Sequence, residues 1–224
     1  MLRCRVLRRR PVVHLRPTRS ARGGSGLHLV GAYAILAILV AAVAVGLRGA
    51  IPWAHPAPAW SLAPPIATAV SVGLGLVFAV IVIGFTRVAV RPFAWARALA
   101  DGLRPAVWSL STPHIVAVAL ASSIAEELLF RAVLVPWLGV VLAALAFGLA
   151  HQMRGPGRWP WVAFSAIVGL VLGALYAATG SLLGPIAAHA AINAANLAWL
   201  RSGAWQGGVS SAPPKSPAQR LSPT

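Results

Sequence analysis

Acidic side chains are almost absent from this sequence. Only three of its 224 residues are Asp or Glu, against 19 Lys and Arg, and charged residues make up 10% of the chain. Because 58% of the residues are hydrophobic and the mean hydropathy is +0.79, this scarcity of charge excludes an ordinary soluble domain. We therefore expect an integral membrane protein.

Cysteine is nearly absent as well. Cys4 is the single cysteine, which excludes an intrachain disulfide and a thiolate metal site. The formal net charge of +16 would suit a nucleic-acid partner, but the basic N-terminal arm has no interleaved aromatic residues and lies next to an apolar run. That placement favours contact with anionic membrane lipids, and we expect no nucleic-acid partner.

Long apolar runs are the main feature that is present. A helix needs roughly 20 apolar residues to cross the hydrocarbon core of a bilayer. Segments that approach or reach this length are residues 29–47, 66–86, 113–135, 138–150, 161–178 and 185–200. The predicted fold class is therefore all-α, a polytopic membrane helix bundle of about six transmembrane segments with a polar intramembrane cavity. The third segment contains the Glu pair and Arg131, the fourth is short and the sixth is at the lower limit, so the last four segments could include tilted or re-entrant pieces.

Arginine is distributed unevenly among the connections between these runs. Eight Arg precede the first run, four follow the second and two follow the fourth, whereas the connections after the first, third and fifth runs contain only Arg48. Short loops rich in Arg and Lys stay on the cytoplasmic side, so both termini are expected in the cytoplasm. One Lys against 18 Arg suggests a GC-rich coding sequence, and we expect the plasma membrane of a bacterium.

Composition divides the chain into four parts. Residues 1–26 form a basic cytoplasmic arm that we expect to be disordered, and residues 27–106 hold two transmembrane helices with their loops. Residues 107–201 form a chemically richer membrane core. Residues 202–224 are rich in Gly, Ser and Pro, a composition that cannot bury enough apolar surface to fold, so this tail is also expected to be disordered.

Polar residues inside the membrane core are few, and such residues usually mark a functional site or pathway. The acidic pair is Glu126 and Glu127, inside an apolar run. Adjacent helical residues diverge by about 100°, so the two carboxylates cannot point the same way. One can face a cavity while the other meets Arg131, which lies four residues beyond Glu127 and on its face.

Two further helices can contribute to the same site. The four-residue spacing puts Phe147 on the face of His151, and His189 on the face of Asn193. A carboxylate, two imidazoles and an amide suit two hydrolytic chemistries. In the first, the carboxylate acts as general base and then acid, while histidine and Asn193 stabilise the oxyanion. In the second, Glu126, His151 and His189 bind a divalent metal such as zinc, which keeps one position open for water.

The three motifs together resemble the signature of a known family. Their order is EExxxR from residue 126, FxxxH from residue 147 and HxxxN from residue 189, which is similar to the type II CAAX prenyl protease and bacteriocin-processing family of intramembrane proteases. The stretch TGSLLGPIAAHAAIN, residues 179–193, is similar to the family's segment before its third motif. The resemblance covers roughly residues 111–200. One departure is Ala132, where a glycine is frequent in the family.

The resemblance implies roles for the residues of the first two motifs. Glu126 would activate the water, and Glu127 would be a second acidic residue near it, held by Arg131. His151 would help to hold or activate the water, with Phe147 packed beside it.

The resemblance also implies that His189 and Asn193 bind the oxyanion of the tetrahedral intermediate. It leaves both a glutamate-type and a metal-dependent protease open, and metal-independent chemistry is slightly favoured. The expected substrates are membrane-associated peptides, either of the CAAX type or of the leader and bacteriocin type.

Other functions fit the same residues and stay open at this point. Glu127 and Arg131 could form a structural ion pair, and His189 with Asn193 could be hydrogen-bonding glue between helices. A proton-coupled carrier could use Glu and His residues as a relay. A non-catalytic scaffold or immunity protein of the same fold would keep the helices without needing catalysis.

Overall fold

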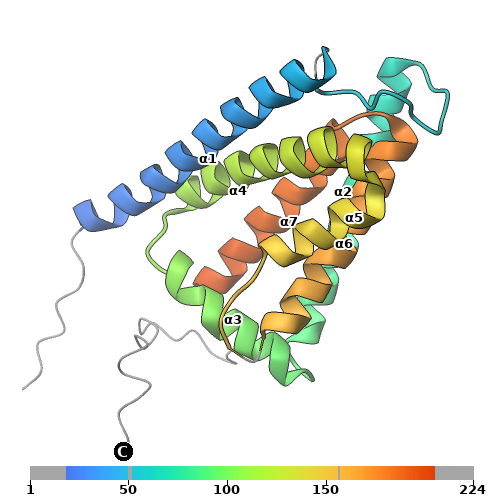
Figure 1. Cartoon of the computed structure of the whole chain (residues 1–224). Coiled ribbons are helices and arrows are strands. Elements are labelled where there is room, and N and C mark those ends of the chain that lie inside the picture. The colour runs from blue at the N-terminus through green and yellow to red at the C-terminus, as the bar shows by residue number, and fades with distance from the viewer. Residues whose placement is uncertain (1–18, 50–51, 156, 205–224) are drawn as a thin grey trace, which may run out of the picture.

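A computed structural model describes residues 19–49, 52–155 and 157–204. The regular elements in these ranges are helices joined by loops, with no strand among them (Figure 1). This confirms the predicted all-α class. The elements are α1 (Arg19–Arg48), α2 (Pro64–Ala89), α3 (Ala94–Val107), α4 (Thr112–Glu127), the π-helix η1 (Leu128–Leu134), α5 (Val135–Ala150), α6 (Arg158–Thr179) and α7 (Leu183–Ser202).

The described residues contain four helical segments that are long and apolar enough to cross a membrane. They are Leu27–Arg48, Pro64–Ala89, Thr112–Ala150 and Arg158–Thr179. The third and fourth predicted runs therefore fall in one continuous 39-residue segment. The sixth predicted run lies on α7 but is not among the four segments. Three polar residues in α7, His189, Asn193 and Asn196, lower its hydropathy.

The segment from α4 to α5 is interrupted at Gly139. This residue has φ 78° and ψ 167°, values that end the regular helix inside α5 and that a residue with a Cβ rarely adopts. The part of α5 after Gly139 packs back against α6 (Figure 1). At the other end, Ser111 rather than Thr112 caps α4, since its hydroxyl accepts a hydrogen bond from the backbone N–H of His114.

Two helices depart from the predicted division of the chain. The region 27–106 contains a third helix, α3, beside the two long helices. It is too short to span a membrane, and it buries one apolar face that includes Ala96, Ala100 and Val107. The basic arm was expected to be disordered up to residue 26, but α1 begins at Arg19. Residues 1–18 of that arm and residues 205–224 of the predicted tail lie outside the described residues.

Close helix packing brings α4, α5 and α7 together. The α2–α7 contact depends on Gly184, because a Cβ there would lie 2.1 Å from the Ser71 hydroxyl oxygen and 2.3 Å from its carbonyl oxygen. The α5–α6 contact depends in the same way on Gly148, where a Cβ would lie 2.6 Å from the carbonyl oxygen of Val162. α1 lies along α4 on the other side of the bundle (Figure 1). The residues of all three motifs therefore meet in the bundle interior.

Candidate active site

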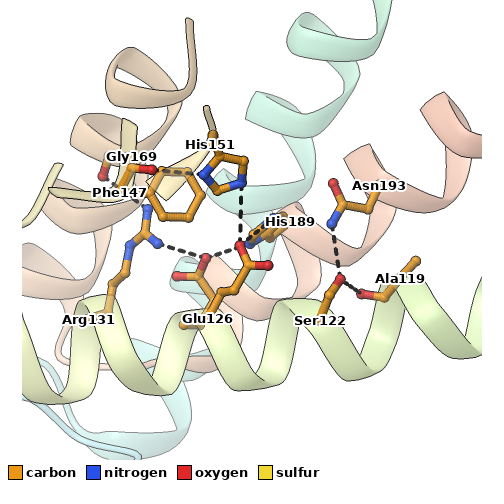
Figure 2. Close-up of polar contacts among 10 residues, drawn as sticks. Ala119, Ser122, Glu126, Arg131, Phe147, His151, Gly169, His189 and Asn193 are labelled. Atoms are coloured by element: carbon orange, nitrogen blue, oxygen red, sulfur yellow. Dashed lines mark hydrogen bonds and ion pairs between the residues drawn. The ribbon is translucent and has the colours of Figure 1, made fainter. Parts of the chain in front are cut away.

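The two adjacent carboxylates at the end of α4 have different sets of partners, and Figure 2 shows Glu126 beside His151 and His189. The Glu127 side chain is fully buried, and its Oε1 atom accepts a hydrogen bond of 3.0 Å from Nη1 of Arg131. Nη2 of Arg131 donates to the carbonyl oxygen of Gly169 on α6, at 3.2 Å. The buried guanidinium is thus shared between a carboxylate and a carbonyl, which offsets part of its desolvation cost.

Glu126 faces the two histidines instead. Its Oε2 atom lies 3.5 Å from Nε2 of His151, which follows the last residue of α5, and 3.9 Å from Nε2 of His189 on α7. The side chains of Glu126 and His151 keep 16% and 22% of their surface exposed, whereas His189 keeps 5%. The Glu126 and His151 side chains are therefore partly exposed, although the Oε2 atom of Glu126 is itself buried and has no hydrogen-bond partner among the described residues. The Glu127 pair is sealed from water.

Hydrogen bonds at Nδ1 fix the tautomer and the orientation of both imidazole rings. Nδ1 of His151 lies 2.8 Å from the carbonyl oxygen of Phe147, an acceptor, so Nδ1 must carry the proton. Nδ1 of His189 lies 2.7 Å from Oε1 of Glu127, and it donates to that oxygen when the carboxylate is ionised. In their neutral forms both rings therefore turn an Nε2 lone pair toward Glu126.

Phe147 packs against Arg131 and both imidazoles. The guanidinium carbon of Arg131 lies 4.5 Å from the centre of its ring, a cation–π contact. The His151 ring centre is 4.3 Å away, and that of His189 is 5.7 Å away. Phe147 thus holds Arg131 and both imidazoles in place through one apolar surface.

Asn193 lies one helical turn from His189 and does not join the cluster of Glu126 and the histidines directly. Its Nδ2 atom donates to the hydroxyl oxygen of Ser122 at 3.3 Å, and this hydroxyl donates to the carbonyl oxygen of Ala119 (Figure 2). Ser122 precedes Glu126 by four residues, so it lies on the same face of α4. That spacing is the sequence signal that could have identified it.

The sequence analysis also missed two other features of the site. The helix changes to π geometry at Leu128, directly after the acidic pair, and π-turns are frequent at functional sites. Trp161 on α6 contacts His151 with ring centres 5.8 Å apart. Ala132, the departure from the family pattern, is fully buried in an apolar cluster of η1, α1 and α6.

The metal alternative gains no support from this arrangement. Within the described ranges, no group of three or more His, Cys, Asp or Glu side chains is arranged to hold a metal ion. His189 also has its Nδ1 atom engaged with Glu127, which leaves only Nε2 available as a ligand.

Comparison with known proteins gives the same result as the motifs. Residues 108–195 match the family described as type II CAAX prenyl endopeptidase Rce1-like. This segment of the chain is similar to that family. The Rce1-like segment contains all three motifs, from Glu126 to Asn193, and it begins just before α4.

A curated relative is the uncharacterized protein YpbD of Bacillus subtilis strain 168. It is 37% identical to this chain over 84 residues, which is 38% of this chain and 44% of YpbD. The chain thus matches less than half the length of this relative. No solved structure matches the chain significantly.

Proposed function

We propose that this protein is an intramembrane endopeptidase that hydrolyses peptide bonds of membrane-associated substrates. The observation that carries the proposal is the position of Glu126, whose Oε2 atom faces Nε2 of His151 at 3.5 Å and Nε2 of His189 at 3.9 Å. A carboxylate and two imidazoles from three separate segments meet there, and the Glu126 and His151 side chains are partly exposed. Similarity to the Rce1-like family supports peptidase chemistry at this position.

Glu126 is proposed as the general base. The three atoms that face one another, its Oε2 and the two Nε2 atoms, are all hydrogen-bond acceptors when the imidazoles are neutral. A water molecule supplies the donors that this group lacks. As the water oxygen attacks the carbonyl carbon of the peptide, Glu126 takes one of its protons, and the carbonyl oxygen becomes an oxyanion. Glu126 then gives that proton to the amide nitrogen as the C–N bond breaks, which releases a carboxylic acid and an amine.

His189 and Asn193 are proposed as donors to the oxyanion. When His189 carries a proton on both ring nitrogens, Nδ1–H donates to the buried carboxylate of Glu127 at 2.7 Å, and Nε2–H can donate to the developing negative charge. The amide of Asn193 has a second N–H beyond the one that it gives to Ser122. A donor already in place for developing charge is among the largest contributions to catalysis.

The proposed setting is the plasma membrane of a bacterium, with both termini in the cytoplasm. At the end of the bundle where α2 and α7 finish and α6 begins, each helix carries an arginine, namely Arg87, Arg201 and Arg158. The opposite end has Arg48 at the end of α1. This asymmetry fits the retention of arginine-rich ends in the cytoplasm. The proposed substrates are CAAX-type, leader or bacteriocin-type peptides presented at the membrane.

Peptide cleavage in liposomes tests the proposal. The full chain is reconstituted with a panel of lipidated and unlipidated peptides, and products are identified by mass spectrometry. We expect Glu126→Gln to lower the rate about 10²- to 10⁴-fold, the usual contribution of a general base. Asp101→Asn makes the same chemical change on α3, away from the motifs, and should leave the rate near that of the unmodified protein.

The same liposomes distinguish the alternatives. Unchanged cleavage in Glu126→Gln would contradict its role as the base. Proton flux that depends on Glu126, without any cleavage, would favour the carrier. Loss of cleavage after treatment with a chelator, restored by added zinc, would establish the metal-dependent route; a metal-independent enzyme keeps its rate.

A further inference from the structure

An apolar cavity lies beside the catalytic cluster, between α2, α3, α6 and α7. With its open mouth it contains about 570 Å³ of empty space. Its apolar walls include Trp95, Leu99 and Leu103 of α3 and Trp161 and Phe164 of α6. None of the catalytic candidates lines it, so its contents need not be the reacting part of a substrate.

At its polar edge, the residues that line this cavity contact the guanidinium of Arg87. Thr86 and Asn196 are the polar residues that line it, and Nη1 of Arg87 donates to Oδ1 of Asn196 at 2.7 Å. The guanidinium of Arg87 also lies 4.4 Å from the ring centre of Trp199, another lining residue, and Nη2 donates to the carbonyl oxygen of Ala195. Arg87 is thus fixed at the cavity edge by neutral groups.

No carboxylate compensates this charge within residues 19–49, 52–155 and 157–204. None of the ion pairs found among these residues includes Arg87. The whole sequence has only three acidic residues against 19 Lys and Arg. A half-buried guanidinium without an internal counterion is a site for an external anion.

The position of the cavity relative to the membrane identifies the kind of anion. Arg87 is two residues from the end of the apolar span Pro64–Ala89, where lipid head groups lie. The amphipathic helix α3 crosses the ends of α6 and α7 and closes the cavity on that side (Figure 1). Exposed Arg91 lies near the same end of α2. Basic sites between membrane helices at the interface suit anionic head groups.

We propose that this cavity binds one acyl chain of an anionic phospholipid, with the head-group phosphate held at Arg87. The apolar walls accept the chain, and the unpaired guanidinium favours a net negative head group over a zwitterionic one. The site does not depend on proteolysis. It has a link to the reaction, because Trp161 lines the cavity and also contacts the His151 ring. A bound chain would restrict the motion of Trp161 next to the catalytic cluster.

Native mass spectrometry of the full chain, released from nanodiscs, measures this binding directly. One set of nanodiscs contains phosphatidylcholine with a small fraction of phosphatidylglycerol, and the other contains phosphatidylcholine alone. We expect the unmodified protein to retain one phosphatidylglycerol selectively. A diazirine group in its acyl chain should label residues of the cavity wall, such as Leu99 and Phe164. Equal retention of phosphatidylcholine would overturn the proposal, and this comparison needs no variant.

Three variants test the two parts of the site. Arg87→Gln should reduce retention of phosphatidylglycerol about fivefold, equivalent to about 1 kcal/mol for one arginine near a phosphate. Ala96→Leu adds a side chain where Ala96 lines the cavity and should lower retention of both lipids at this site. Arg158→Gln is the charge-matched control, since Arg158 contacts Gln152 and Trp159, which do not line the cavity.

Each of the other outcomes of these experiments either supports or overturns the proposed lipid site. Loss of retention in Arg158→Gln to the same degree as in Arg87→Gln would mean a diffuse belt of bound lipid and would overturn the site. Labelling of the cavity wall by a lipidated peptide, but not by phosphatidylglycerol, would assign the cavity to substrate instead. Circular dichroism and the unfolding midpoint of each variant separate lost binding from lost folding. Retention that falls only in Arg87→Gln and Ala96→Leu, with both variants folded, would establish the proposal.

Discussion

Two faces of α4 carry one carboxylate each, and they differ in every property that governs a carboxylate's chemistry. On one face, Glu127 is fully buried and bonded to Arg131 and to His189. On the other, Glu126 keeps 16% of its side-chain surface exposed and faces two imidazole nitrogens that offer lone pairs. Adjacent positions in one sequence thus supply a buried, paired carboxylate and a partly exposed carboxylate, which we propose as the general base.

The difference shows how the protein holds a reactive group in an apolar interior. The Glu127 and Arg131 charges are balanced and hydrogen-bonded, so this face fixes the positions of α4, α6 and α7 relative to one another. Glu126 has no such anchor of its own, and its position follows from that frame. We therefore predict that substitutions on the Glu127 face mainly lower the unfolding free energy, whereas substitutions at Glu126 mainly lower the cleavage rate.

The largest stability effect is expected from Arg131→Met. Removal of the guanidinium leaves the carboxylate of Glu127 buried without its cation, which typically costs about 3 to 5 kcal/mol of unfolding free energy. Unfolding in mixed micelles measures the change. Glu126→Gln should alter the same quantity by less than about 1 kcal/mol, because its side chain is partly exposed and outside the buried pair.

A double variant separates loss of the pair from loss of packing. Glu127→Gln combined with Arg131→Met removes both charges, and replacing a buried pair by neutral groups is often close to neutral. We therefore expect the double variant to be more stable than Arg131→Met alone. Equal destabilisation in the two would mean that the shape of the Arg131 side chain, not its charge, holds this face together.

Much of this division could be predicted from the sequence. The spacing of EExxxR places Glu127 against Arg131 and turns Glu126 away, because both follow from the angle between successive helical residues. The all-α class followed from composition and long apolar runs. The catalytic roles of Glu126, His151, His189 and Asn193 stay predictions, since contacts alone do not establish a reaction.

Other features depend on contacts that no local pattern encodes. The helix α3 has no long apolar run, since Arg97, Asp101 and Arg104 interrupt its Ala and Leu residues, so a search for membrane spans does not find it. The π-turn at Leu128 shifts backbone hydrogen bonds without a characteristic residue. The partner of Asn193 is Ser122, 71 residues away, and only the packing of α4 on α7 brings them together.

Gly184→Ala tests whether the packing of α2 on α7 keeps His189 in contact with both Glu126 and Glu127. The new methyl group would lie 2.1 Å from the Ser71 hydroxyl and 2.3 Å from its carbonyl oxygen, so α2 and α7 must separate. Forced overpacking of this kind costs about 1 to 3 kcal/mol. Gly73→Ala on α2 is the matched control, because a Cβ there meets nothing within 4 Å, and it should leave the midpoint of thermal unfolding unchanged or higher.

A shift of α7 would also move His189, which follows Gly184 by five residues on the same helix. We therefore expect Gly184→Ala to lower the cleavage rate as well as the unfolding midpoint. A variant as stable as the unmodified protein would show that the α2–α7 contact can relax, and that His189 is held by Glu127 alone.

The smallest effect comes from the serines that precede the two carboxylates by one turn. Ser122 accepts the hydrogen bond of Asn193, so Ser122→Ala frees the amide that we propose as an oxyanion donor. One hydrogen bond is worth about 0.5 to 1.5 kcal/mol, which predicts a fall in kcat/KM of about two- to tenfold, carried by kcat rather than KM.

Ser123 is the control on the other face, since its buried hydroxyl has no hydrogen-bond partner among the described residues. Ser123→Ala should keep the full rate and unfold no more easily, because it removes an unsatisfied polar group. Equal rates for the two variants would contradict a role of Ser122 in positioning Asn193.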